Sequence, residues 1–359
     1  MKLQGTIETD FGFAAGWVHF GEEDGKDKVQ LSFPLIGDMN NDTEEAVVTD
    51  STVDCVMYIN DFPAEIALKK ENGIWRGTID LKSIGFHKDL DATEISDEPG
   101  FAAHHFVIPE VNIKKLQAHC EYTYEDVETE FVYELCNEEV LAYVKEKGID
   151  VENKHDFATA CALMKKTAEV IHHDGVNYSH DNDNNGTIAQ FQFAEKQGNY
   201  TNCRGIAIIF AGVLRAYGYK ANVVECWPEK SDAPDIHVVC EAFIEELNKY
   251  VLLDVTNNLV LFLDGTPLSI IELRDAIVQE KSDLITINED AAHNGVKADL
   301  IDSIAFMSRN LMFLRKGFVS DEETEVEKEN AFCLAPKDLI EEGYPKSARF
   351  TCNRKEFYA

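Results

Sequence analysis

The fold is decided by the stretch NCRGIAIIFAGVLRAYG, which covers residues 202–218. Nearly every position in the middle of this stretch is apolar, and Gly218 is a natural residue to end a helix. Because a helix that is apolar on all sides is buried on all sides, the pattern predicts a central helix over residues 203–217. Cys203 then lies in the first turn, where free amide groups and the positive end of the helix dipole favour a thiolate.

Strand-like runs follow this helix and carry two further reactive residues. His237 lies in the second run and Asp254 in the third. A hairpin turn centred between Glu245 and Glu246 would place His237 opposite Asp254, with Cβ atoms about 5 Å apart. The carboxylate could then hold one imidazole nitrogen while the other faces the thiol, which is the arrangement of nucleophile, base and orienting acid in a catalytic triad. The runs cover residues 221–227, 236–244 and 250–255.

Three segments carry a resemblance to a known family. Residues 202–221 are similar to a nucleophile helix with an "L-R-A-x-G-x-x-A" exit, residues 237–243 to an "H-x-W-x-E-V-Y" strand, and residues 250–256 to a "W-x-x-x-D-P-T" strand. The chain thus resembles the transglutaminase-like superfamily of papain-related folds, as a bacterial-type member. The resemblance covers about residues 150–285. Val239 replaces the usual aromatic residue and Val255 the usual proline, and neither change removes a reactive group.

The resemblance implies an α+β fold, in which the Cys203 helix packs on an antiparallel sheet that carries His237 and Asp254. Short alternating runs before residue 130 predict an all-β, sandwich-like domain or an open barrel. We therefore expect a sandwich-like domain over residues 1–132 and a transglutaminase-like catalytic domain over residues 133–359.

Composition limits the partners and the compartment. Sixty-six Asp and Glu residues against 33 Lys and Arg give a net charge of −33, which disfavours binding to nucleic acid or to an anionic membrane surface. No run approaches the ~18 apolar residues of a membrane span, and the first residues lack the apolar core of a signal peptide. Nine scattered cysteines without a CxxC pair fit a reducing compartment, so we expect a cytoplasmic protein.

Several polar residues are candidates for contacts with a substrate. Gln197 lies six residues before Cys203, at the offset where papain-like proteases place an oxyanion-hole glutamine. Tyr200 and Asn202 compete with it as side-chain donors, although the backbone N–H of Cys203 is the simplest oxyanion donor. Trp227 ends the strand before the His237 strand, where it could line a substrate cleft or pack in the core.

Two motifs suggest metal ions, and neither leads to an assigned site. Adjacent histidines such as His172 and His173 point about 100° apart on a helix and are poor joint ligands. The run Asp181–Asn185 matches the start of a calcium loop, but Gln192 stands where the bidentate acid is needed. We expect no metal and no cofactor, and a flexible polar loop at 181–186.

The expected chemistry is acyl transfer at an amide or peptide carbonyl through a thioester, with hydrolysis favoured over cross-linking because no amine-acceptor site stands out. Glu241, on the same strand as His237, is expected to be a structural hydrogen-bonding residue. One alternative is a non-catalytic binding or scaffold protein that kept the fold. Another is a thiol redox protein, which would need Cys226 or Cys240 within about 7 Å Cα–Cα of Cys203. Substrate and oligomeric state are left open.

Overall fold

The structure is a computed structural model, and the described residues form two compact units, one within Met1–Pro109 and one from Glu110 onward. Helix α1 (Glu110–Ala118) belongs to the second unit, whereas the division after residue 132 would assign it to the first. The independence of the two domains stays a prediction. The structure describes residues 1–9, 12–23, 25–32, 43–59, 62–82, 86–95, 110–129, 131–174, 186–229, 236–298, 300–322, 330–341 and 349–358.

The N-terminal unit is built from one antiparallel sheet of eight strands, in the order β3-β2-β1-β8-β7-β6-β5-β4. Alternating apolar residues of these strands point inward and form the core, where the rings of Phe20 and Trp75 meet with centroids 5.1 Å apart. The strands are β1 (Lys2–Thr9), β2 (Gly12–Glu23), β3 (Lys26–Ser32), β4 (Thr43–Val48), β5 (Thr52–Ile59), β6 (Phe62–Glu71), β7 (Ile74–Leu81) and β8 (Phe86–Ile95).

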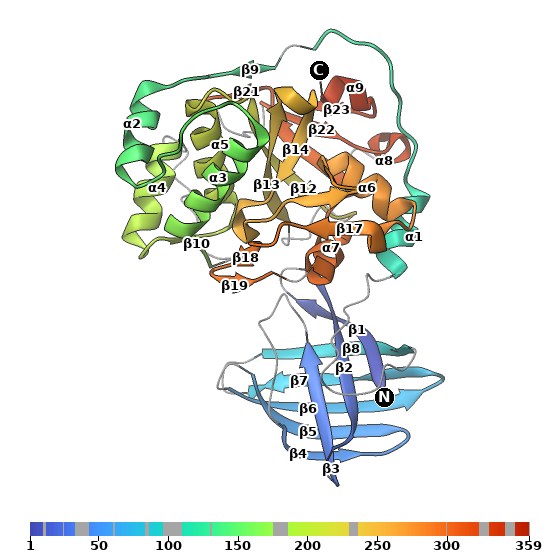
Figure 1. Cartoon of the computed structure of the whole chain (residues 1–359). Helices are drawn as coiled ribbons and strands as arrows, with labels where there is room; N and C mark the ends of the chain where they lie inside the picture. The colour runs from blue at the N-terminus through green and yellow to red at the C-terminus, as the bar shows by residue number, and fades with distance from the viewer. Residues whose placement is uncertain are drawn as a thin grey trace. The chain divides into compact units, whose positions relative to one another are not determined.

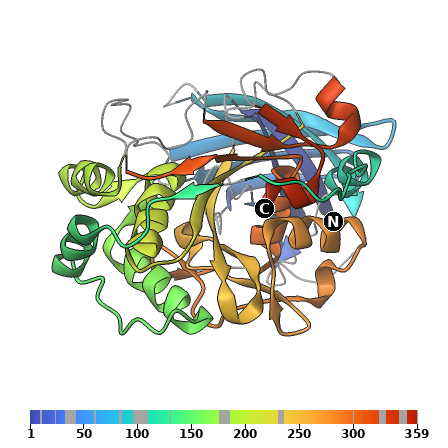
Figure 2. The ribbon, with the colours of Figure 1, turned by 90° about the horizontal axis from the view of Figure 1, so that it is seen from above.

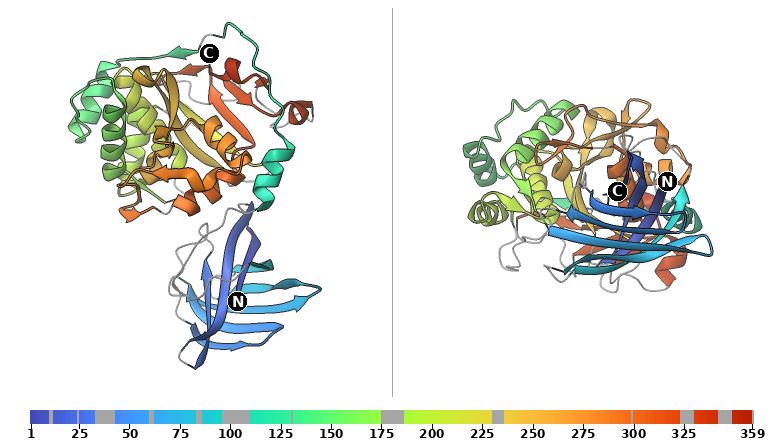
Figure 3. Two further views of the ribbon diagram at one scale, coloured as in Figure 1. Left: turned by 45° about the vertical axis from the view of Figure 1, so that its right-hand side comes forward. Right: turned by 90° about the horizontal axis from the view of Figure 1, so that it is seen from below.

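The sheet rolls over until its two edge strands meet. The Thr43 hydroxyl of β4 donates to the Val29 carbonyl of β3 at 2.6 Å, and the Val48 N–H donates to Asp27 Oδ2 at 2.8 Å. Strands β1–β3 cross over the remaining strands (Figure 3). Of the two expected architectures, the open barrel fits and the two-sheet sandwich does not, because all eight strands belong to one sheet in which β1 pairs with β8. Strand length and spacing are the same in both architectures, so the sequence pattern did not separate them.

The second unit is mixed helix and sheet. Its main sheet has six strands in the order β14-β13-β12-β20-β22-β23, antiparallel except for the last pair. These strands are β12 (Ala221–Trp227), β13 (His237–Ile244), β14 (Lys249–Leu253), β20 (Phe313–Gly317), β22 (Ala331–Leu334) and β23 (Arg349–Thr351).

Helix α5 (Cys203–Ala216) is the centre of this unit, as the sequence predicts, and nearly all of its residues are buried. It packs on one face of β12 and β13, and helices α2 (Glu138–Glu146), α3 (Phe157–Val170) and α4 (Thr187–Lys196) surround its other sides (Figures 1 and 2). Gly212 allows α4 to approach closely, because a Cβ at this position would lie 1.6 Å from Thr187 Oγ1.

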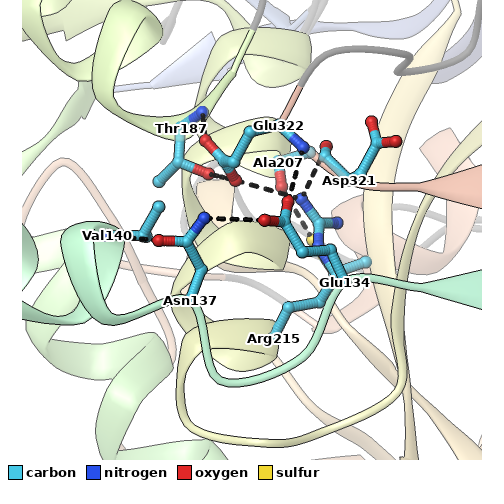
Figure 4. Close-up of polar contacts among 9 residues, drawn as sticks. Glu134, Asn137, Val140, Thr187, Ala207, Arg215, Asp321 and Glu322 are labelled. Atoms are coloured by element: carbon cyan, nitrogen blue, oxygen red, sulfur yellow. Dashed lines mark hydrogen bonds and ion pairs between the residues drawn. The ribbon is translucent and has the colours of Figure 1, made fainter.

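A polar cluster ties the ends of several segments to α5 (Figure 4). Buried Arg215 of α5 donates to the Asp321 carbonyl at 3.2 Å and pairs with Glu322. The Glu322 carboxylate also accepts the Thr187 N–H at 2.5 Å and the Thr187 hydroxyl at 2.6 Å, which caps α4. The Glu322 N–H donates to Glu134 Oε2 at 3.1 Å. Parallel pairing of β9 (Val132–Tyr133) with β21 (Val319–Ser320) lies next to this cluster.

The remaining elements cover the other side of the sheet and its edges. Helix α6 (Ile270–Val278) begins with a capping box formed by Ser269 and Glu272. No helix among the described residues is both long and apolar enough to cross a membrane. The other elements are β10 (His172–His173), β11 (Tyr200–Thr201), β15 (Leu261–Leu263), β16 (Thr266–Pro267), β17 (Ile285–Ile287), β18 (Ala292–His293), β19 (Val296–Lys297), α7 (Leu300–Arg309), α8 (Lys337–Glu341) and α9 (Arg354–Phe357), with short 3₁₀ turns at Glu245–Leu247, Val255–Asn257 and Ser282–Leu284.

Candidate active site

Cys203 is the first residue of α5, directly after the N-cap. Asn202 has an extended backbone, and its side-chain oxygen accepts the Gly205 N–H at 3.1 Å, so the helix begins where the sequence predicts. The Cys203 side chain is half-buried. Its position places the sulfur beside backbone N–H groups of the first turn, which have no acceptor in the preceding turn of the helix. This is an electropositive setting for a thiolate.

His237 and Asp254 meet, but not as direct partners in a hairpin. The register of β13 and β14 pairs Cys240 with Leu253, so the pairing is shifted by two residues from the prediction and Asp254 lies beyond the end of β14. His237 Nε2 nevertheless lies 3.0 Å from Asp254 Oδ2, and both side chains are buried. The predicted contact is therefore present, while the predicted cross-strand register is wrong.

Asp254 is held by the turn that it begins. It is the N-cap of the 3₁₀ turn Val255–Asn257, and its Oδ1 accepts the Thr256 N–H at 3.1 Å. Its Oδ2, which faces His237, also accepts the Asn257 side-chain amide at 2.8 Å. These donors hold both carboxylate oxygens and stabilise the charge of the carboxylate.

The charged forms of Cys203, His237 and Asp254 stabilise one another. Burial opposes ionisation of Cys203, but hydrogen bonds with His173 and His237 lower the pKa of the Cys203 thiol to about 6. Burial also disfavours the imidazolium of His237, yet the charge and hydrogen bond of Asp254, together with Cys203, raise the pKa of His237 to about 10. The pKa of Asp254 is lowered, because the charge of His237 outweighs the effect of burial. The directions of these pKa shifts favour a thiolate on Cys203 and an imidazolium on His237 at neutral pH.

Neighbouring elements fix the His237 ring. Its backbone pairs with Cys226 of β12, and the ring packs edge-on against Phe306 of α7, with centroids 5.1 Å apart and planes at 66°. An aromatic wall on one side and a carboxylate on the other leave the imidazole little freedom to turn away from the sulfur.

Sequence reasoning missed three residues around this group. His173 contacts Cys203, Asn257 supports Asp254, and His293 Nδ1 lies 2.9 Å from Asn257 Oδ1. The sequence presents the His172–His173 pair only as a possible metal site, and helix α4 separates the pair from the Cys203 helix. Asn257 follows Asp254 closely, and an amide near a turn carboxylate is a signal of local hydrogen bonding. Nothing in the sequence pointed to His293.

A second polar group adjoins Cys203 through its neighbour Arg204. Glu225 is fully buried and binds two guanidinium groups, those of Arg204 and of Arg315, whose NH2 group donates to Glu225 Oε1 at 3.0 Å. The Trp227 indole N–H donates to Glu225 Oε2 at 2.9 Å, and Arg315 lies over the Trp227 ring. The predicted cleft residue Trp227 is thus connected to the residue after Cys203, and its contact with a substrate stays a prediction.

The other substrate-contact candidates have these positions. Gln197 is the exposed C-cap of α4. Tyr200 is 41 % exposed, and its ring packs against His172. Asn202 uses its side-chain oxygen to cap α5. The oxyanion roles proposed for these residues stay predictions, and the Asn202 oxygen is already occupied by a backbone donor.

Glu241 has the structural role expected from the sequence. It is buried, and its Oε1 accepts the Ile270 N–H at 2.8 Å and the Tyr358 hydroxyl at 3.0 Å. Burial raises the pKa of Glu241 to about 7. The positive charge of buried Lys316 lies near Glu241 and acts against this rise. The Lys316 ammonium group lies over the rings of Phe131 and Phe357.

The described residues include no group of three or more His, Cys, Asp and Glu side chains arranged to hold a metal ion. The candidate calcium run Asp181–Asn185 lies outside the described residues. All nine cysteines are free thiols. Burial raises the pKa of Cys226 well above its ordinary value, and buried Cys240 donates to the Ala207 carbonyl at 3.1 Å. The raised pKa disfavours a thiolate on Cys226, and the thiol redox alternative stays untested.

Comparison with known proteins gives weak structural likenesses only. No protein-family model matches the chain, and no curated protein matches it. Among solved structures, similarity is found to a "putative cysteine protease" from Cytophaga hutchinsonii, with 13 % identity, 81 % of this chain and 86 % of that chain covered, and a TM-score of 0.27. A "putative protease" from Parabacteroides distasonis has 10 % identity, coverage of 54 % and 37 %, and a TM-score of 0.24. Red sea bream transglutaminase has 13 % identity, coverage of 86 % and 52 %, and a TM-score of 0.26. At these TM-scores the likenesses carry no argument, and the function is argued from the residues.

Proposed function

We propose that this chain is a cysteine-dependent acyl-transfer enzyme that hydrolyses an amide or peptide bond through Cys203, His237 and Asp254. The observation that carries the proposal is geometric: Asp254 holds one nitrogen of the His237 ring at 3.0 Å, and Cys203 is the first residue of α5. The hydrogen bond of His237 to Cys203, which lowers the pKa of the thiol, supports it. A half-buried thiol with a pKa of about 6 is an activated nucleophile, whereas an inert buried thiol has a raised pKa.

The proposed reaction proceeds in two halves. The Cys203 sulfur attacks the carbonyl carbon, the C–N bond breaks, and His237 gives its proton to the leaving amine. Water then attacks the thioester while His237 takes one of its protons, the C–S bond breaks, and the carboxylic acid leaves. Asp254 keeps Nε2 of the ring engaged, which leaves Nδ1 for the sulfur. Backbone N–H groups at the start of α5 would stabilise the oxyanion.

The test uses an activated ester, because it requires no knowledge of the natural substrate. Mixing the protein with p-nitrophenyl acetate should release a burst of one nitrophenolate per chain and add one acetyl group at Cys203, detected by mass spectrometry. Cys203→Ala should abolish both signals. Cys161→Ala is the matched control, because Cys161 is also half-buried but burial raises its pKa to about 12.

Hydrolysis and amine transfer are separated in a second measurement. With a peptide amide library, hydrolysis incorporates ¹⁸O from labelled water into the product carboxyl group, whereas transamidation incorporates an added fluorescent amine. We expect ¹⁸O incorporation. Absence of acylation at Cys203 with every acyl donor would contradict the proposal and favour a non-catalytic binding protein.

A further inference from the structure

We propose that His173 is a second hydrogen-bond donor to the Cys203 sulfur, which holds the thiolate in place but does not serve as the base. The inference deepens the proposed function, because it treats Cys203 as the nucleophile. It assigns a catalytic contact to a histidine outside the Cys203–His237–Asp254 group.

The backbone of His173 is fixed from two sides. Strand β10 pairs in parallel with β11, so that His173 lies opposite Thr201, two residues before Cys203. The side chain of Asn294 binds both backbone polar groups of His173. The His173 N–H donates to Asn294 Oδ1 at 2.8 Å, and the Asn294 amide donates to the His173 carbonyl at 2.7 Å. A backbone held on both of its polar groups fixes the starting point of the side chain.

The ring of His173 is positioned by a second histidine. It packs edge-on against His293, with centroids 5.1 Å apart and planes at 80°. His293 in turn contacts Asn257, the residue that donates to Asp254. The two imidazoles that reach the sulfur are therefore tied to one polar support, His237 through Asp254 and His173 through His293 and Asn257.

His237 and His173 differ in the group that contacts each imidazole ring. Asp254 stabilises the imidazolium of His237, which makes His237 the base. Within the described part of the chain, His173 forms no ion pair with a carboxylate, and its ring is backed by the ring of His293. His173 therefore contributes an N–H donor to the thiolate, and the hydrogen bond that it forms is one of the interactions that favour the charged sulfur.

A donor of this kind has two opposite effects on reactivity. It lowers the thiol pKa, and it also lowers the intrinsic nucleophilicity of the thiolate, which falls with pKa at a Brønsted coefficient of about 0.4–0.5. One hydrogen bond to a charged group corresponds to about one pKa unit. Loss of the donor should therefore speed alkylation about threefold on the high-pH plateau. Below the pKa it should slow alkylation about threefold, because the thiolate fraction falls about tenfold while the remaining thiolate reacts about threefold faster.

The experiment measures alkylation of Cys203 by iodoacetamide between pH 5 and pH 9.5. Tryptic cleavage after Lys196 and Arg204 releases residues 197–204, in which Cys203 is the sole cysteine, so its rate is read without interference from the other thiols. The variants are His173→Phe, which keeps a ring but has no donor, and His173→Gln, which keeps an N–H. His172→Gln is the matched control, because the neighbouring ring packs against Tyr200.

We expect the profile of His173→Phe to shift upward by about one pH unit and to cross the wild-type profile, while His173→Gln and His172→Gln follow the wild type. An unchanged midpoint in His173→Phe, or the same shift in His172→Gln, would overturn the inference. His237→Ala separates this result from failure of the proposed function. If His237→Ala alone raises the midpoint, only the role of His173 is wrong, whereas no shift in either variant contradicts both.

Discussion

His237 Nε2 lies 3.0 Å from Asp254 Oδ2, although the two residues are not opposite each other in the hairpin that joins their strands. Asp254 reaches the imidazole because it lies beyond the strand end and caps a 3₁₀ turn, whose amides fix its carboxylate. Because Asp254 lies outside the β13–β14 pairing, its backbone is not paired with β13. The orientation of the carboxylate is thus set by the turn and not by the sheet register.

Replacing Asp254 with Asn should remove most of the activity without unfolding the protein. The amide has the same shape but no charge to stabilise the His237 imidazolium, so the rate of ester hydrolysis should fall by roughly 10²–10⁴-fold. Titration of His237 by NMR should show its pKa well below about 10. Asp264→Asn is the control, because it places the same substitution in an exposed turn of the same unit. Equal activity of the two variants would contradict the role of Asp254.

The pH dependence of activity should have two limbs. The rate rises with pH through about 6, because the Cys203 thiolate forms there, and falls through about 10, where His237 loses the proton that the leaving group needs. The measurement is kcat/KM for an amide substrate between pH 4.5 and pH 10.5. A rate that begins to rise only near pH 8.5, the ordinary pKa of a cysteine, would show that the thiol is not activated.

Glu225→Gln should destabilise the second unit strongly. The substitution leaves the guanidinium groups of Arg204 and Arg315 without their buried counter-charge, at a cost of about 3–5 kcal/mol in the free energy of unfolding. Lys165→Met breaks the exposed ion pair with Asp290 and should cost about 0–1 kcal/mol. Urea unfolding monitored by tryptophan fluorescence compares the two. A similar loss in both variants would mean that the buried cluster adds no stability beyond that of a surface pair.

The boundary between the units can be tested with two truncations. Residues 110–359 keep α1, whose Gln117 amide donates to the Val278 carbonyl at 3.0 Å and whose Leu116 carbonyl accepts a hydrogen bond from Arg274. Residues 133–359 lose α1 and also Phe131, which covers Lys316 at 3.8 Å. We therefore expect the longer piece to fold and the shorter one to melt at a clearly lower temperature by circular dichroism. Equal melting temperatures would favour the boundary after residue 132.

Local signals in the sequence predicted the elements of the site well. The apolar run after Asn202 identifies the buried helix and its first residue, and the Ser269–Glu272 pair identifies the start of α6. Both features depend on neighbouring residues, so their physical cause is contained in a few consecutive positions. The contact of His237 with Asp254 was also predicted, but from a cross-strand pairing that is wrong, because Asp254 lies beyond the end of β14 and caps a turn.

Features that depend on distant segments were not readable. The eight-stranded sheet closes through contacts of Thr43 with Val29, which no alternation of apolar residues specifies. The hairpin register shifted by two residues because the turn is a 3₁₀ turn followed by Asn248 in a left-handed conformation. The backbone of His173 is held beside Thr201 by β11 and by Asn294, which lies far along the chain. In each case the local sequence pattern fits several arrangements, and tertiary contacts select one of them.

Selective alkylation of Cys203 is the most direct test of the account. At pH 6.5, where ordinary thiols are protonated, limiting iodoacetamide should label Cys203 at least tenfold faster than half-buried Cys161, and His237→Ala should abolish this preference. Labelling of Cys203 at the rate of Cys161, or a preference that survives in His237→Ala, would contradict the thiolate–imidazolium pair on which the proposed acyl transfer depends.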